Sequence, residues 1–110
     1  MSKGMSNHVL DVLAATIKAR RNATLEDSYT KRLLAEPIKP AKKVGEEGVE
    51  VALAAVGQDK PSLIGETADL LYHLLVVLES RDVTLDEVYA ELERRMAASE
   101  QQKQRKAASA

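Results

Sequence analysis

Residues 44–78 read VGEEGVEVALAAVGQDKPSLIGETADLLYHLLVVL, and this stretch determines the fold. Apolar residues recur in it at helical spacing on both sides of a short break, GQDKP at residues 57–61. Glycine after one helix and proline near the start of the next are typical of a tight turn. The stretch therefore predicts an antiparallel hairpin of two helices, over residues 41–56 and 62–80.

Two helices are expected before this hairpin. The first is predicted by an apolar stripe at helical spacing, which fades near residues 20–22 and consists of Val9, Val12, Leu13 and Ile17. A short second helix is expected over residues 28–35. Pro37 and Pro40 then favour a linker over residues 36–40, because proline lacks a backbone donor and restrains the residue before it.

A fifth helix is expected after the hairpin. It should begin at Thr84, where Thr84 and Glu87 fit a capping box, and end near Met96. The sequence from residue 97 has helical propensity but no apolar stripe. We therefore predict an all-α domain over residues 1–96, with about five helices around the central antiparallel hairpin, and a frayed or disordered tail over residues 97–110.

Composition limits the classes of function. The 110 residues, 45% hydrophobic and 30% charged, are typical of one soluble globular domain. A formal charge of -1 provides no positive field for nucleic acid, and no stretch approaches the roughly 20 apolar residues of a membrane span. The lack of cysteine and of an apolar signal core at the N-terminus favours the cytoplasm. We expect no nucleic-acid partner and no membrane.

Five acidic residues of the hairpin are the candidate site. Glu46, Glu47 and Glu50 precede the turn, and Glu66 and Asp69 follow it. At about 100° per residue, Glu47 and Glu50 share one helix face, as do Glu66 and Asp69. A straight hairpin brings Glu50 level with Glu66 and Asp69, so four or five carboxylates are expected to converge.

Carboxylates this close repel one another and need a compensating cation. Magnesium fits best, since it prefers oxygen ligands and keeps waters beside substrate phosphates. The absence of cysteine and the presence of only two histidines disfavour zinc. The alternative is a solvated acidic stripe. Apolar neighbours such as Val49 and Leu70 argue against it, because a carboxylate set in apolar surface is more often functional.

Three lysines, Lys39, Lys42 and Lys43, precede the acids. One interpretation is ordinary helix pairing of Lys42 with Glu46 and of Lys43 with Glu47. The other is capture of substrate phosphate at the positive N-terminal end of the helix. Both interpretations stay open.

His73 follows Asp69 by one helical turn. We expect a core histidine that donates a hydrogen bond to Asp69, with a phosphate-contacting role as the alternative. The three tyrosines, Tyr29, Tyr72 and Tyr89, are the only aromatic residues. Packing is the expected role of each, and any of them is a candidate to stack on a base.

Four strings extend the pattern over most of the chain: SYTKRLL at 28–34, KKVGEEGVEVALAA at 42–55, ETADLLYHLLVVL at 66–78 and LDEVYAELERR at 85–95. The motif EExxE followed by ExxD resembles the all-α, MazG-type nucleotide pyrophosphohydrolases. Together with these strings it resembles the phosphoribosyl-ATP pyrophosphatase family. Gly48 departs from the alanine common at that position, which casts little doubt on the chemistry.

The resemblance implies hydrolysis of 1-(5-phosphoribosyl)-ATP to the AMP derivative and pyrophosphate, the second step of histidine biosynthesis. It also implies magnesium and a homo-oligomer, a dimer or a dimer of dimers. By position, the metal ligands are Glu47, Glu50, Glu66 and Asp69, while Lys42 and Lys43 match the family's basic pair.

Several points stay open at this stage. Glu46 and Glu47 are both candidates to accept the proton of the attacking water. Other classes are a pyrophosphatase for ordinary or damaged dNTPs, a non-catalytic helical interaction module, and a di-iron carboxylate bundle, which would need a Glu-x-x-His pairing. Leucines and valines cover so much of residues 62–80 that we expect this helix at the centre of a subunit interface.

Overall fold

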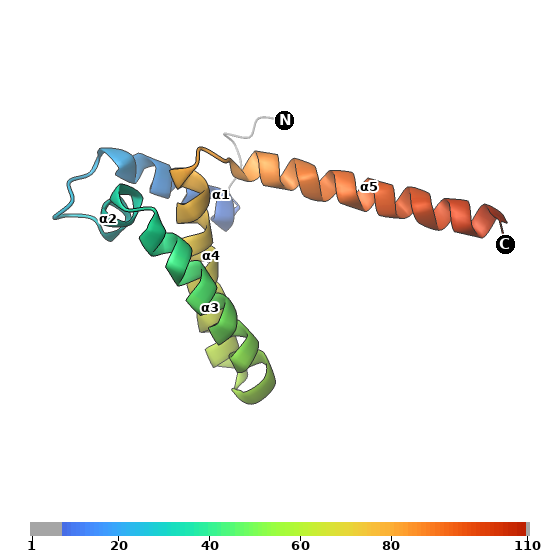
Figure 1. Cartoon of the computed structure of the whole chain (residues 1–110), viewed down its shortest axis with the longest axis horizontal. Coiled ribbons are helices and arrows are strands. Elements are labelled where there is room, and N and C mark those ends of the chain that lie inside the picture. Colours follow the sequence, from blue (N-terminus) through green and yellow to red (C-terminus); the bar gives the residue numbers. More distant parts are fainter. Residues whose placement is uncertain (1–7, 110) are drawn as a thin grey trace.

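The computed structural model describes residues 8–109 and confirms an all-α fold, with five α-helices and no strand among those residues. The helices are α1 (Val9–Ala19), α2 (Tyr29–Ala35), α3 (Ile38–Gly57), α4 (Lys60–Ser80) and α5 (Leu85–Ser109), and a 3-10 turn, η2 (Arg20–Asn22), extends α1. Figure 1 shows α3 and α4 side by side, with α1 and α2 near one end of the pair and α5 leaving the body.

The central hairpin of α3 and α4 is confirmed. Only Gln58 and Asp59 separate the two helices. Asp59 is the N-cap of α4, and its Oδ1 accepts a hydrogen bond of 2.9 Å from the backbone N–H of Ser62. Hydrogen bonds from the side chain and then from the backbone of Ser62 lower the pKa of the Asp59 carboxyl, because they favour its ionised form. A side-chain cap thus stabilises the start of α4 after the turn.

The expected linker over residues 36–40 is wrong, because α3 already begins at Ile38. Pro37 is its N-cap and Pro40 lies buried in its first turn. A proline is tolerated there, since the first backbone N–H groups of a helix have no intrahelical acceptor. As a consequence, Lys39 lies on the same helix as the two lysines that follow it.

The hydrophobic core lies at the end of the hairpin away from the turn. Its buried members come from α1, α2 and the second half of α4, and are Ile17, Leu33, Leu75 and Val76. Half-buried neighbours complete it, including Leu85 from the start of α5. At the other end of the hairpin, apolar side chains of α3 and α4 stay exposed in the single chain: Val49, Leu53, Val56 and Ile64.

A left-handed residue ends α4. Asp82 has φ 58°, and its N–H donates to the carbonyl of Glu79, while the N–H of Val83 donates to the carbonyl of Leu78. These two bonds form a Schellman motif. Arg21 braces the turn by ion pairs with Glu79 and Asp82.

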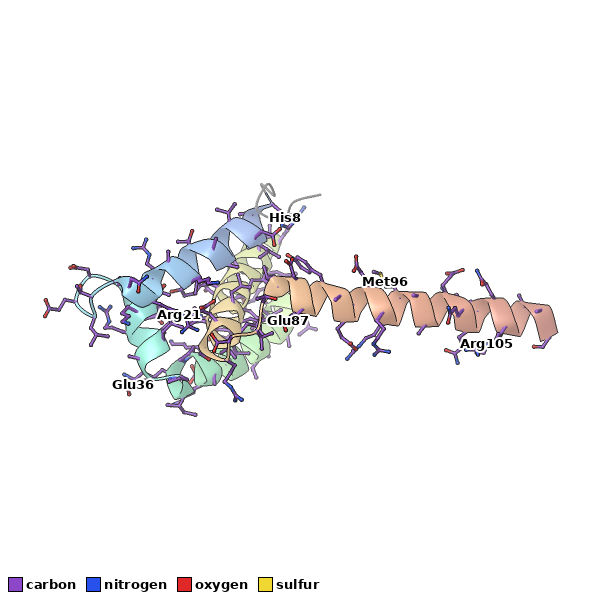
Figure 2. All side chains as sticks on the ribbon, turned by 90° about the horizontal axis from the view of Figure 1, so that it is seen from above. His8, Arg21, Glu36, Glu87, Met96 and Arg105 are labelled. Atoms are coloured by element: carbon purple, nitrogen blue, oxygen red, sulfur yellow. The ribbon has the colours of Figure 1, made fainter. Side chains whose placement is uncertain are left out.

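Helix α5 is longer than the sequence predicts. The capping box of Thr84 and Glu87 is confirmed, with bonds of 2.8 and 3.1 Å, but the expected end near Met96 is wrong, because the helix continues to Ser109. Figure 2 shows α5 projecting past Met96 and Arg105, away from the body. The radius of gyration, 17.7 Å, exceeds the roughly 13 Å of a compact chain of this length.

By length and composition alone, α4 is apolar enough to cross a membrane. It carries Glu66, Asp69 and His73 near its middle, and such groups are costly in lipid. It also packs against α1, α2 and α3. It is the central helix of the bundle.

Candidate active site

The five acids lie along the facing helices α3 and α4 but differ in exposure. Glu47 is buried, with 8% of its surface exposed, and Glu66 is half-buried. Glu46, Glu50 and Asp69 are exposed. In the single chain, Glu47 is therefore the one acid of the five that is buried.

Glu66 is at the electrostatic centre of the group. Three effects raise the pKa of its carboxyl most. In order of size they are desolvation, the charge of Glu50 and a hydrogen bond with Glu50. The charges of Asp69 and Glu47 raise it further. Helices α3 and α4 thus bring four of the predicted acids within electrostatic reach of one another.

The carboxylates do not close around a single point. Within residues 8–109, no three acidic or histidine side chains are arranged to hold one metal ion. The backbone hairpin therefore gathers the candidate ligands, and rotation of the exposed carboxylates would be needed to bring them onto one ion.

A chain of hydrogen bonds leads from Glu47 to α2. His73 Nδ1 lies 2.7 Å from Glu47 Oε1 and 3.1 Å from the backbone oxygen of Asp69. His73 Nε2 lies 3.1 Å from the hydroxyl of Tyr29. The histidine is therefore a buried core residue as expected, but its side-chain partner is Glu47 of the facing helix, and Asp69 contributes only its carbonyl.

A groove of about 350 Å³ opens beside the acids. Its lining comes from α2 and from the first half of α3 and consists of Tyr29, Leu33, Lys39, Lys42, Lys43 and Glu46. Lys39 pairs with Glu36 at 3.1 Å. In the described part of the chain, neither Lys42 nor Lys43 forms an ion pair, so the helix-pairing interpretation of these two lysines has no support.

The structure distinguishes the three tyrosines. Tyr72 packs against the core, and Tyr89 donates a 3.1 Å hydrogen bond to Asp11. Tyr29 is 45% exposed, lines the groove and contacts His73. Sequence reasoning found the tyrosine but missed its link to Glu47, because that link depends on how α2 crosses the hairpin.

The sequence matches the family described as Phosphoribosyl-ATP pyrophosphohydrolase over residues 10–96. A relative named phosphoribosyl-ATP pyrophosphatase from Rhodobacter capsulatus is 54% identical over 91 residues, which cover 82% of this chain and 88% of the relative. Proteins of the same name from Methylobacterium nodulans and Cereibacter sphaeroides are 52% and 55% identical, over 86% and 83% of this chain and 90% and 89% of theirs.

The matched region begins within α1 and ends within α5, so it contains the whole hairpin, the five acids, the groove and the chain from Tyr29 to Glu47. Both the profile match and the identities above 50% cover most of the sequence. The chain belongs to the phosphoribosyl-ATP pyrophosphohydrolase family.

Proposed function

We propose that this protein hydrolyses 1-(5-phosphoribosyl)-ATP to 1-(5-phosphoribosyl)-AMP and pyrophosphate, the second step of histidine biosynthesis, in the cytoplasm. As a member of its family it is a hydrolase. The observation that carries the proposal is a groove lined by three lysines and by Glu46, the residue before Glu47, on the helix that supplies two of the acids grouped around Glu66. A triphosphate and the cations it needs would be bound at adjoining surfaces.

Magnesium is the proposed cofactor, with Glu47, Glu50, Glu66 and Asp69 as its ligands. Their oxygens suit a hard divalent cation. Desolvation first, and then the charges of neighbouring acids, raise the pKa of Glu66, and a bound cation would offset both effects. When bound, magnesium would neutralise charge on the leaving pyrophosphate and lower the pKa of the attacking water.

The remaining roles belong to the groove. Lys42 and Lys43 offer ammonium groups to the substrate phosphates, and Lys39 adds a third at the first turn of α3. Glu46 is exposed in the same groove, whereas one oxygen of Glu47 is occupied by His73. Glu46 is therefore better placed than Glu47 to accept the proton of the attacking water.

The active unit is proposed to be a homo-oligomer, a dimer or a dimer of dimers. Support comes from apolar surface that one chain leaves in water: Val49, Leu53 and Val56 on α3, and Leu92 and Met96 on α5. Ile64 and Leu74 on α4 are exposed as well, so the candidate interface extends over α3, α4 and α5.

The test is pyrophosphate release from phosphoribosyl-ATP, followed with magnesium and with EDTA, next to a panel of dNTPs. We expect release only with magnesium and a much higher kcat/KM for phosphoribosyl-ATP. A higher kcat/KM for a dNTP would contradict the proposed substrate. Turnover in EDTA would contradict magnesium as the cofactor.

A further inference from the structure

The hydrogen-bond partners of His73 fix the tautomer of its ring. Its Nδ1 faces two acceptors, the Oε1 of Glu47 at 2.7 Å and the carbonyl of Asp69 at 3.1 Å. A carbonyl oxygen can only accept, so Nδ1 must carry a proton. In the neutral ring Nε2 is then the acceptor, and the Tyr29 hydroxyl donates to it.

These bonds form one chain that crosses three helices. Tyr29 on α2 donates to His73 on α4, and His73 donates to Glu47 on α3. The histidine and the glutamate are buried, at 7% and 8% exposure. A buried carboxylate is costly unless it accepts hydrogen bonds, so the orientation of Glu47 depends on this donor.

We propose that Tyr29 and His73 are positioning residues that act in series on Glu47. This chain of hydrogen bonds occupies Oε1 of Glu47, so Oε2 of Glu47 remains as the oxygen available to a cation. This inference rests on the proposed magnesium site. It adds to that proposal two residues that need not touch the metal, and it assigns them a measurable effect on the affinity for magnesium.

The chain also connects the two halves of the site. The ring of Tyr29 lines the basic groove, while its hydroxyl holds the histidine. The guanidinium of Arg32 lies 5.9 Å from the centre of that ring. One side chain thus borders the surface proposed for phosphate and supports the carboxylate proposed for magnesium.

The aromatic cluster supplies a matched control. Tyr72 lies next to both rings, with its centroid 6.3 Å from that of Tyr29 and 4.9 Å from that of His73. Its hydroxyl bonds to Thr30 instead of His73. Tyr72→Phe therefore removes a hydroxyl from the same cluster and leaves the chain to Glu47 intact.

The first measurement is the tautomer, by ¹⁵N NMR of the histidine ring in magnesium-free protein. We expect His73 to carry its proton on Nδ1 in the wild type and in Tyr72→Phe. Tyr29→Phe should change the shift of Nε2, because that atom loses its donor. A proton on Nε2 in the wild type would overturn the inference without reference to activity.

The second measurement is magnesium binding by calorimetry. His73→Phe removes the donor to Glu47, and we expect a 10- to 100-fold weaker affinity, as for other residues that orient metal ligands. Asn at position 73 keeps an N–H near the place of Nδ1, so His73→Asn should recover most of the affinity. Tyr29→Phe should fall between these variants, and Tyr72→Phe should match the wild type.

The outcomes separate the two proposals. Wild-type affinity in both His73→Phe and Tyr29→Phe would contradict the positioning roles alone. A wild type that binds no magnesium would contradict the proposed function together with this inference. Circular dichroism of each variant checks that the helices are retained, and rescue by His73→Asn excludes a purely structural effect of the ring.

Discussion

His73 Nδ1 on α4 lies 2.7 Å from Glu47 Oε1 on α3, so one hydrogen bond joins the two arms of the hairpin through the candidate site. The bond connects the packing of the two helices with the orientation of the carboxylate. Changes at this site are therefore expected to affect catalysis and helix packing by separable amounts.

The amide variants Glu47→Gln and Asp69→Asn should lose activity while the fold is retained. Each keeps the shape of the side chain but removes a ligand charge, and we expect rates lower on the order of 10² or more. Pyrophosphate release and circular dichroism measure the two effects. Glu93→Gln, on exposed α5, is the control, and wild-type turnover in both site variants would refute the metal assignment.

Glu66→Gln should raise the melting temperature of the metal-free protein. The raised pKa of Glu66 means that the folded chain holds this proton more tightly than the unfolded chain. Stability should therefore fall as pH rises from the ordinary glutamate pKa, about 4.3, through the raised value. Thermal melts in EDTA over this range should show the fall in the wild type and its absence in the variant.

Magnesium should raise the melting temperature of the wild type, because it binds the folded state and relieves repulsion among the carboxylates. The increase should be smaller in Glu66→Gln, which has lost one ligand charge. An unchanged wild-type melting temperature in saturating magnesium would count against the site.

Lys42→Ala and Lys43→Ala should raise KM more than they lower stability. Neither lysine forms an ion pair among the described residues, so its removal should change the stability of the helix little. Removal of an ammonium group that contacts phosphate should weaken substrate binding. An increase on the order of tenfold corresponds to about 1.4 kcal/mol. Lys103→Ala, far along α5, is the control, and unchanged kinetics in both groove variants would exclude phosphate capture.

Asp59→Ala should lower the melting temperature by removing the N-cap of α4, while Asp59→Ser should largely preserve it. The depressed pKa of Asp59 gives the sign of the pH effect. Its contribution is present above the unfolded pKa and is lost as pH falls through the folded value. Melts of the wild type and Asp59→Ala should therefore converge toward low pH.

The double variant Leu92→Glu, Met96→Glu should dissociate the oligomer. Both side chains are exposed on α5 in the single chain, and charge on a buried apolar interface is unfavourable. Sedimentation at micromolar concentration measures the mass, with Arg105→Glu as the control. A fully active wild type near 12.0 kDa, the mass of one chain, would exclude the oligomer.

The hairpin and its acids could be predicted because they depend on local rules: helical spacing, a glycine-proline turn, and carboxylates on one face. The start of α3 could not, because Pro37 and Pro40 signal a helix end and a first turn equally well. The sequence underestimates the length of α5 for a different reason. An apolar stripe determines whether a helix packs against the rest of the protein. Residues with high helix propensity can keep a segment helical without such packing, as in the second half of α5.

The link from His73 to Glu47 could not be predicted either, because it depends on the rotation of one helix against another. From α4 alone, Asp69 one turn away was the natural partner. The structure shows how α3 and α4 are aligned with each other. In this alignment the carboxylate of buried Glu47, and not that of exposed Asp69, is the acceptor for His73.

The left-handed turn at Asp82 gives α5 the geometry of a lever. Its 25 residues span about 37 Å, so a rotation of about 10° at the turn would move the far end by about 6 Å. The two ion pairs of Arg21 stiffen this pivot from η2. A small change in backbone angle at one aspartate would therefore be magnified into a displacement larger than one helical turn.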